Sequence, residues 1–115
     1  MGLAWSEGYK IHEIRIIFCD KKTVRDINRN FLKHDYDTDI ITFPFSENDQ
    51  PIEAELYISI PQIKKQAKEW GCSFKQELHR IIFHGLLHLC GYNDKTTQQK
   101  EEIRQKEDYY LNKYL

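Results

Sequence analysis

Residues 84–94 have the sequence HGLLHLCGYND, and this stretch organises the rest of the chain. Its two histidines are four residues apart, so on an α-helix both rings lie on one face and can bind one ion. The run around them is apolar, and an imidazole buried there without a partner costs a few kcal/mol. Gly91 is typical of a helix end, and the turn that follows can return Asp94 to the histidines. His84, His88 and Asp94 would leave an open fourth position, as in a catalytic zinc site.

A metalloprotease is a second interpretation of the histidine pair, because the His-Glu-x-x-His pattern places a general base directly after the first histidine. Here that position is Gly85, which argues against peptide hydrolysis by that mechanism. Cys90 lies two residues after His88, so on a helix its thiol points away from the pair and we expect it in the core. Glu77, seven residues before His84, shares the ligand face. It is a candidate outer partner of the ligands, or a solvated carboxylate in the first helical turn.

The bulk composition is that of one soluble domain. The 115 residues are 40% hydrophobic and 30% charged, and the formal net charge of −1 gives no global signature of nucleic-acid binding. No run approaches the roughly 20 apolar residues that cross a membrane, and the N-terminus has no secretion signal. Three cysteines without framework spacing indicate reduced thiols. We therefore expect a cytoplasmic protein without membrane attachment.

The periodicity of the chain predicts an α+β fold. Residues 1–9 have little pattern, and we expect them to be loosely ordered. Strands are predicted over 10–19, 40–45 and 52–60, a helix over 21–33, and further helices from Pro61 to Gly71, from Ser73 through the histidines, and from Thr96 or Thr97 to about 113. We expect one domain over 1–115, a small mixed β-sheet covered by helices, with the histidine helix in the middle.

Charge is unevenly distributed along the chain. Residues 36–59 contain six acidic side chains and no lysine or arginine, whereas the helices on either side are net positive. These helices can present a phosphate-binding face, although a solvated helix surface is the default interpretation. The candidate RNA-contacting side chains are Arg29, Lys33, Lys64, Lys65 and Lys68.

The stretch at 84–94 resembles the signature of the YbeY family, bacterial rRNA maturation factors described as zinc-dependent single-strand endoribonucleases. The resemblance extends to TDIITFP at 38–44, ELYIS at 55–59 and Ile27-Asn28, and covers roughly residues 14–113. It implies an α+β fold and one zinc ion held by His84, His88 and Asp94. It also implies RNA as substrate, with a role in 16S rRNA 3′-end maturation and ribosome quality control.

Three features depart from the family pattern. The third ligand is more often histidine, whereas here it is Asp94; aspartate binds zinc at about 2.0–2.2 Å, and we expect the site to survive as a weaker Lewis acid. The family arginine three residues before Asp35 is replaced by Leu32, so Lys33 or Arg29 takes its role or activity is lower. The chain also begins close to the first family strand, and we expect an upstream strand and helix to be missing or shortened.

The leading hypothesis is therefore a zinc-dependent endoribonuclease. Attack could come from a zinc-activated water or from the substrate's own 2′-OH, and the sequence identifies no general base. A second hypothesis is a ribosome-associated RNA-binding factor whose zinc is mainly structural. A third is a metal-dependent hydrolase that acts on a non-nucleic substrate.

Overall fold

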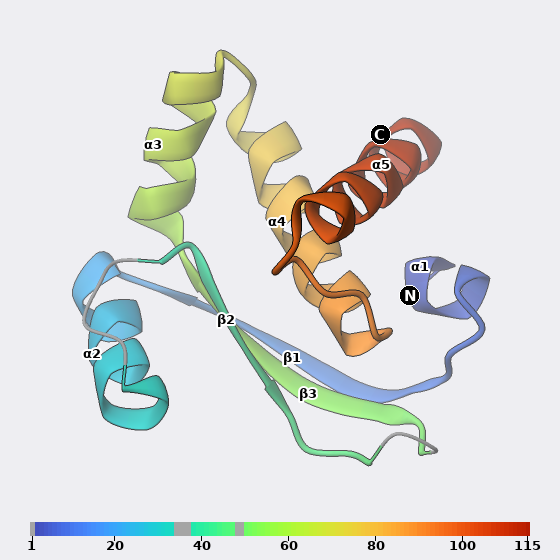
Figure 1. The fold of residues 1–115 in the computed structure, drawn as a ribbon. Coiled ribbons are helices and arrows are strands. Elements are labelled where there is room, and N and C mark those ends of the chain that lie inside the picture. The colour runs from blue at the N-terminus through green and yellow to red at the C-terminus, as the bar shows by residue number, and fades with distance from the viewer. Residues whose placement is uncertain (1, 34–37, 48–49) are drawn as a thin grey trace.

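The structure, a computed structural model, describes residues 2–33, 38–47 and 50–115. Within these residues it is a three-stranded sheet with helices on both faces, so the predicted α+β architecture is confirmed (Figure 1). In chain order the elements are α1 Gly2–Ser6, β1 Ile11–Cys19, α2 Lys21–Leu32, β2 Ile40–Pro44, β3 Ile52–Ser59, α3 Ile60–Trp70, α4 Phe74–Leu89 and α5 Thr97–Tyr114.

The sheet is mixed, with the strand order β1-β3-β2. Strand β3 is parallel to β1 and antiparallel to β2. The alternation predicted for β3 is present, because every second side chain is buried on one face: Ile52, Ala54, Leu56 and Ile58. On the opposite face Tyr57 contacts Phe43 of β2 edge to face, and Phe43 contacts Phe31 of α2 in the same way. Helix α2 therefore covers the face of the sheet that is turned away from α4.

Helix α4 crosses the buried face of the sheet at Gly85. A Cβ atom at this position would lie 2.8 Å from the Ile40 side chain and 3.5 Å from Leu56. The close approach of helix and strands thus depends on the absence of a side chain. Helices α3 and α5 pack against α4, which places it in the middle of the helical layer as predicted (Figure 1).

Polar side chains cap the starts of several helices, and glycines follow the ends of two of them. Asp20, Ser73 and Thr96 each cap the following helix by accepting a backbone N–H from the residue three positions on. Gly71 and Gly91 follow α3 and α4 with φ of 68° and 96°, a region that favours glycine. In the described part of the chain, none of the helices combines the length and apolar character needed to cross a bilayer.

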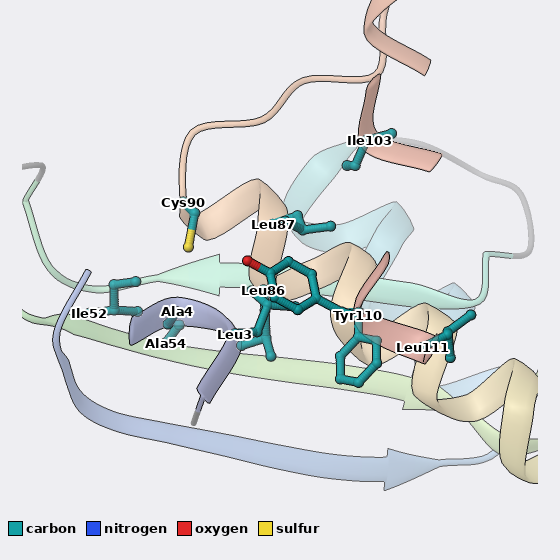
Figure 2. Close-up of a cluster of buried hydrophobic side chains, with 11 residues drawn as sticks. Leu3, Ala4, Ile52, Ala54, Leu86, Leu87, Cys90, Ile103, Tyr110 and Leu111 are labelled. Atoms are coloured by element: carbon teal, nitrogen blue, oxygen red, sulfur yellow. The ribbon is translucent and has the colours of Figure 1, made fainter. Parts of the chain in front are cut away.

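Helix α1 lies within the main hydrophobic cluster (Figure 2). Leu3 and Ala4 are 2% and 0% exposed and pack with side chains of α4, α5 and β3. For residues 2–9, which the structure describes, the expectation of loose order is therefore wrong. A five-residue helix has too few positions to show a period, and burial rather than intrinsic propensity stabilises it. Cys90 belongs to the same cluster, which confirms its expected place in the core, and all three cysteines are free thiols.

A clasp of hydrogen bonds follows α1 and centres on the Glu7 carboxylate. It accepts from the Tyr92 hydroxyl at 2.7 Å, from Lys106 at 3.3 Å and from the Tyr110 hydroxyl. The clasp connects the N-terminal helix to the turn after α4 and to the middle of α5. Both connected segments contribute to the site described next.

Candidate metal centre

His84 and His88 are brought together by consecutive turns of α4. Their Nε2 atoms lie 2.9 Å apart, and both rings are half-buried. The helix ends at Leu89 with Cys90 as its C-cap, and the turn through Gly91 places Asp94 Oδ2 3.4 Å from His84 Nε2 and 3.5 Å from His88 Nε2. The three residues proposed from spacing therefore do meet in space, with one donor atom of each within 4.8 Å of the others.

These separations suit one small cation. Two atoms held about 2.0–2.1 Å from a tetrahedral zinc ion lie about 3.3–3.4 Å from each other. The two distances to Asp94 are close to that value, and the distance between the two nitrogens is somewhat shorter. The donor set therefore fits a divalent metal ion without rearrangement of the backbone.

The second nitrogen of each ring strengthens this interpretation. His88 Nδ1 lies 2.9 Å from the Tyr92 carbonyl oxygen, and His84 Nδ1 lies 2.6 Å from Oε2 of Glu107. A carbonyl and a carboxylate only accept hydrogen bonds, so both Nδ1 atoms must donate. The two Nε2 lone pairs of neutral rings then face each other. A bound cation resolves this arrangement, and such outer hydrogen bonds commonly orient metal-binding histidines.

Glu107 is the outer carboxylate of the site, and it comes from α5. It is 5% exposed, and Arg80 donates to its Oε1 at 3.1 Å while also contacting Asp108 at 2.6 Å. Burial, the largest single effect, disfavours charge on the His84 ring, but the hydrogen bond to Glu107 and the negative charges of Glu107, Asp94 and Asp39 together outweigh it and raise the pKa of His84. The hydrogen bond to Glu107 also makes His84 Nε2 a better electron donor to a metal ion.

Sequence reasoning missed Glu107 because the last helix is highly charged along its length. A signal was nevertheless present. Glu107 lies four residues after Ile103 and four before Leu111, on the inner seam of α5 where an unpaired carboxylate would be costly. A charged residue in the seam of a helix that packs beside two histidines is a candidate partner for them.

Glu77, the outer partner suggested by spacing, has a different partner in the structure. It is buried and accepts a hydrogen bond from Gln66 Nε2 at 2.9 Å. The same nitrogen lies 3.2 Å from Asp39 Oδ2, so one amide joins two carboxylates. Glu77 lines the same cavity as His84, whereas the carboxylate that contacts the His84 ring is Glu107.

The structure does not place the five basic RNA-contact candidates in the wall of that cavity. Arg29 and Lys33 belong to α2 and its C-cap, on the other side of the sheet from α4, and Arg29 pairs with Asp26 at 2.8 Å. The remaining candidates are exposed on α3: Lys64, Lys65 and Lys68. The basic side chains that do line the cavity, besides Arg80, are Lys100 and Arg104 of α5.

The position of the replaced family arginine lies at the end of α2. Leu32 is 41% exposed there, the last residue of the helix before its C-cap. Asp35, the acidic residue quoted with it, lies outside the described residues. The structure therefore places Leu32 on α2, which covers the far face of the sheet, and not on α4, which holds both histidines.

Known proteins of one family match this chain over most of its length. The family model described as Endoribonuclease YbeY matches residues 3–115. The protein named Endoribonuclease YbeY from Chlorobium limicola is 46% identical over 109 residues, which cover 95% of this chain and 75% of the relative. The one from Cytophaga hutchinsonii is 50% identical over 109 residues, or 95% and 76% of the two chains.

A solved structure has the same fold. The solution structure of TM1509 from Thermotoga maritima superposes with a TM-score of 0.68 at 27% identity. The match covers 96% of this chain and 72% of that protein.

Proposed function

This chain belongs to the YbeY family, and from that premise we propose that it is a metal-dependent endoribonuclease of single-stranded RNA. The observation that carries the proposal is the site on α4, where His84, His88 and Asp94 converge and both imidazoles are oriented through their Nδ1 atoms. Family membership supports the reaction class, and the converged donor atoms supply a place for it.

The residues of the site have separate tasks in this proposal. His84 and His88 offer their Nε2 lone pairs, because Glu107 and the Tyr92 carbonyl hold the protons on the opposite nitrogens. Asp94 adds a negative charge that offsets the charge of the ion. A divalent ion held by His84, His88 and Asp94 would supply a Lewis acid for the phosphodiester and would make a bound water more acidic. The cavity lined by His84 and Asp94 gives the RNA strand access to the site.

We propose zinc as the metal. Two imidazoles and one carboxylate are a donor set typical of zinc and neighbouring transition metals, whereas magnesium prefers oxygen ligands alone. The outer hydrogen bonds of both rings also favour an ion that binds imidazole.

In the cell we propose that the substrate is the 16S rRNA precursor on the small ribosomal subunit, in the cytoplasm. The resemblance to rRNA maturation factors in the signature region and the strands supports this role. Expression of the chain in a bacterium that lacks its own YbeY protein should restore the mature 16S 3′ end, mapped by RNA 3′-end sequencing. The His84→Ala variant should fail to restore it.

The biochemical test uses purified, zinc-loaded protein and single-stranded RNA. Cleavage should stop on addition of a chelator and return with added zinc. His84→Ala should abolish both stoichiometric zinc, measured by elemental analysis, and cleavage. His79→Ala is the matched control, because His79 lies on the same helix. In the described residues its hydrogen-bond partner is the Lys75 carbonyl oxygen and none of the three metal-site residues. The variant should retain both.

Two results would count against the proposal. Cleavage that persists in chelator would remove the metal from the mechanism. A fully zinc-occupied protein without cleavage would favour the alternative of an RNA-binding factor with a structural metal.

A further inference from the structure

A cavity of about 600 Å³ adjoins the metal centre, between α3, α4 and α5. His84 and Asp94 contribute to one part of its wall. Trp70, from the last turn of α3, and Arg104, from α5, contribute to another. Its volume is within the range of roughly 300–1,000 Å³ that is usual for small-molecule sites. A ligand group in this cavity would therefore be held next to the metal ligands.

Apart from Asp94, which belongs to the metal centre, the acidic side chains that line this cavity already accept hydrogen bonds. Glu107 accepts from Arg80 and from the His84 ring, and Asp39 and Glu77 share the amide of Gln66. Each of these three carboxylates therefore accepts at least one hydrogen bond from within the protein.

Two cationic side chains that line the same cavity lack an ion-pair partner in the described residues. Lys100 and Arg104 are exposed, and neither forms an ion pair within the described part of the chain. Both lie on α5, four residues apart and so on one face of the helix. The charge without an ion-pair partner on this stretch of α5 is therefore positive. It suits an anion such as a phosphodiester.

Trp70 adds an aromatic surface beside these cations. Its side chain is 69% exposed, although it is the largest apolar type of side chain. The Arg104 guanidinium lies over the indole, 5.8 Å from its centroid, near the outer limit of a cation–π contact. An exposed indole next to uncompensated positive charge is the combination with which proteins bind single-stranded nucleic acid, by base stacking and phosphate contacts.

We propose that Trp70, Lys100 and Arg104 form a nucleotide subsite of the metal centre. A base of single-stranded RNA stacks on the Trp70 indole, and its flanking phosphates contact Lys100 and Arg104. The choice of RNA as the occupant rests on the proposed function. By fixing one nucleotide in this cavity, the subsite determines which neighbouring phosphodiester lies at the metal centre.

The first test is fluorescence, because the chain contains two tryptophans. In the Trp5→Phe variant the signal comes from Trp70 alone, and in Trp70→Phe it comes from Trp5, which is 75% exposed on α1. Zinc-loaded protein is mixed with short single-stranded RNA in a stopped-flow instrument, and the binding phase is read before cleavage. RNA should quench Trp70 and not Trp5. Duplex RNA, whose bases are already stacked, should quench neither.

The second test is a variant series. Trp70→Ala should weaken RNA binding roughly tenfold, the scale of one base stack, and Trp70→Phe should recover most of it. Trp5→Ala, equally exposed, is the matched control and should bind as wild type. Because Trp70 is exposed, its replacement should leave the thermal unfolding midpoint unchanged.

A third test separates the base from the phosphates. RNA with one abasic nucleotide, moved along the strand, should lose affinity at one position, and this loss should disappear in Trp70→Ala. Lys100→Ala should reduce the slope of log affinity against log salt by about 0.7, as expected for one single-strand phosphate contact. A slope that responds to Lys68→Ala and not to Lys100→Ala would place the strand on the outer face of α3 and overturn the subsite.

The outcomes distinguish the subsite from the reaction. If wild-type protein cleaves RNA and Trp70→Ala binds as tightly, the subsite is refuted and the endoribonuclease proposal stands. If binding depends on Trp70 but zinc-loaded protein never cleaves, the subsite stands and the reaction is wrong. If zinc-loaded protein does not bind single-stranded RNA, both are overturned.

Discussion

Replacement of Glu107 by glutamine tests whether this carboxylate sets the orientation and tautomer of the His84 ring. The carboxylate satisfies two donors, Arg80 at 3.1 Å through Oε1 and His84 Nδ1 at 2.6 Å through Oε2. Glutamine has the same shape but offers one acceptor and one donor at these positions. We expect its oxygen to face Arg80, because hydrogen bonds from a charged guanidinium are the stronger. Its amide nitrogen then faces His84.

This exchange changes the tautomer of His84. Facing a donor, Nδ1 must accept, and the proton of the neutral ring moves to Nε2, 2.9 Å from the Nε2 of His88. Metal binding must then reverse the tautomer and lose the new hydrogen bond. Loss of an outer partner of a metal-binding histidine typically costs about 10- to 100-fold in affinity, or roughly 1.4–2.8 kcal/mol. We expect Glu107→Gln to fall in that range.

The assay is zinc competition against a chromophoric chelator at neutral pH. Asp108→Asn is a matched control, because Asp108 is the next residue and contacts the same Arg80, at 2.6 Å, from the exposed side of α5. It should bind zinc as tightly as wild type. Wild-type affinity in Glu107→Gln, or an equal loss in both variants, would refute the argument that this carboxylate sets the His84 tautomer.

Three further variants test other parts of the structure. Asp94→Asn should weaken zinc binding by at least about 1–2 kcal/mol, because the loss of a side chain that only orients a metal ligand already costs about that much. If the variant competes for zinc as well as wild type does, Asp94 is only a turn residue. Gly85→Ala should lower the free energy of unfolding by about 1–3 kcal/mol, because its methyl group meets Ile40, and a urea titration identical to wild type would contradict this. Burial alone would raise the pKa of Glu7, but hydrogen bonds from Tyr110, Tyr92 and Lys106 lower this pKa below its ordinary value. The carboxylate therefore stabilises the fold at neutral pH and loses this effect as pH falls through the folded-state pKa. In urea titrations the stability gap between wild type and Glu7→Gln should be largest near neutrality and close in acid, and a gap that does not change with pH would be evidence against this.

Those parts of the fold that depend on local pattern were predictable from sequence. The alternation from Ile52 to Ile58 marks a half-buried strand, and the cap residues Ser73 and Thr96 mark the starts of α4 and α5. The convergence of the donor atoms followed from helical geometry, because a spacing of four residues and a glycine turn leave few other arrangements.

The remaining features depend on contacts between distant segments. Nothing local marks Leu3 as buried, since its partners lie on α4, α5 and β3. Glu107 is one of many charged residues on α5, and only the packing of that helix against α4 selects it as the partner of His84. Gly85 shows the same limit. The lack of a side chain at this position argued against a protease base from sequence alone, whereas its packing role against Ile40 required the structure.

The clasp at Glu7 has a consequence for folding kinetics. It joins residues 85 positions apart at Tyr92 and 103 positions apart at Tyr110. Contacts between such distant residues close the largest chain loops and carry the highest entropic cost before they form. Tyr92 also supplies the carbonyl that orients His88. We therefore expect His88 to reach its final orientation only when the segment around Glu7 has met Tyr92 and α5, so that high metal affinity arises late in folding.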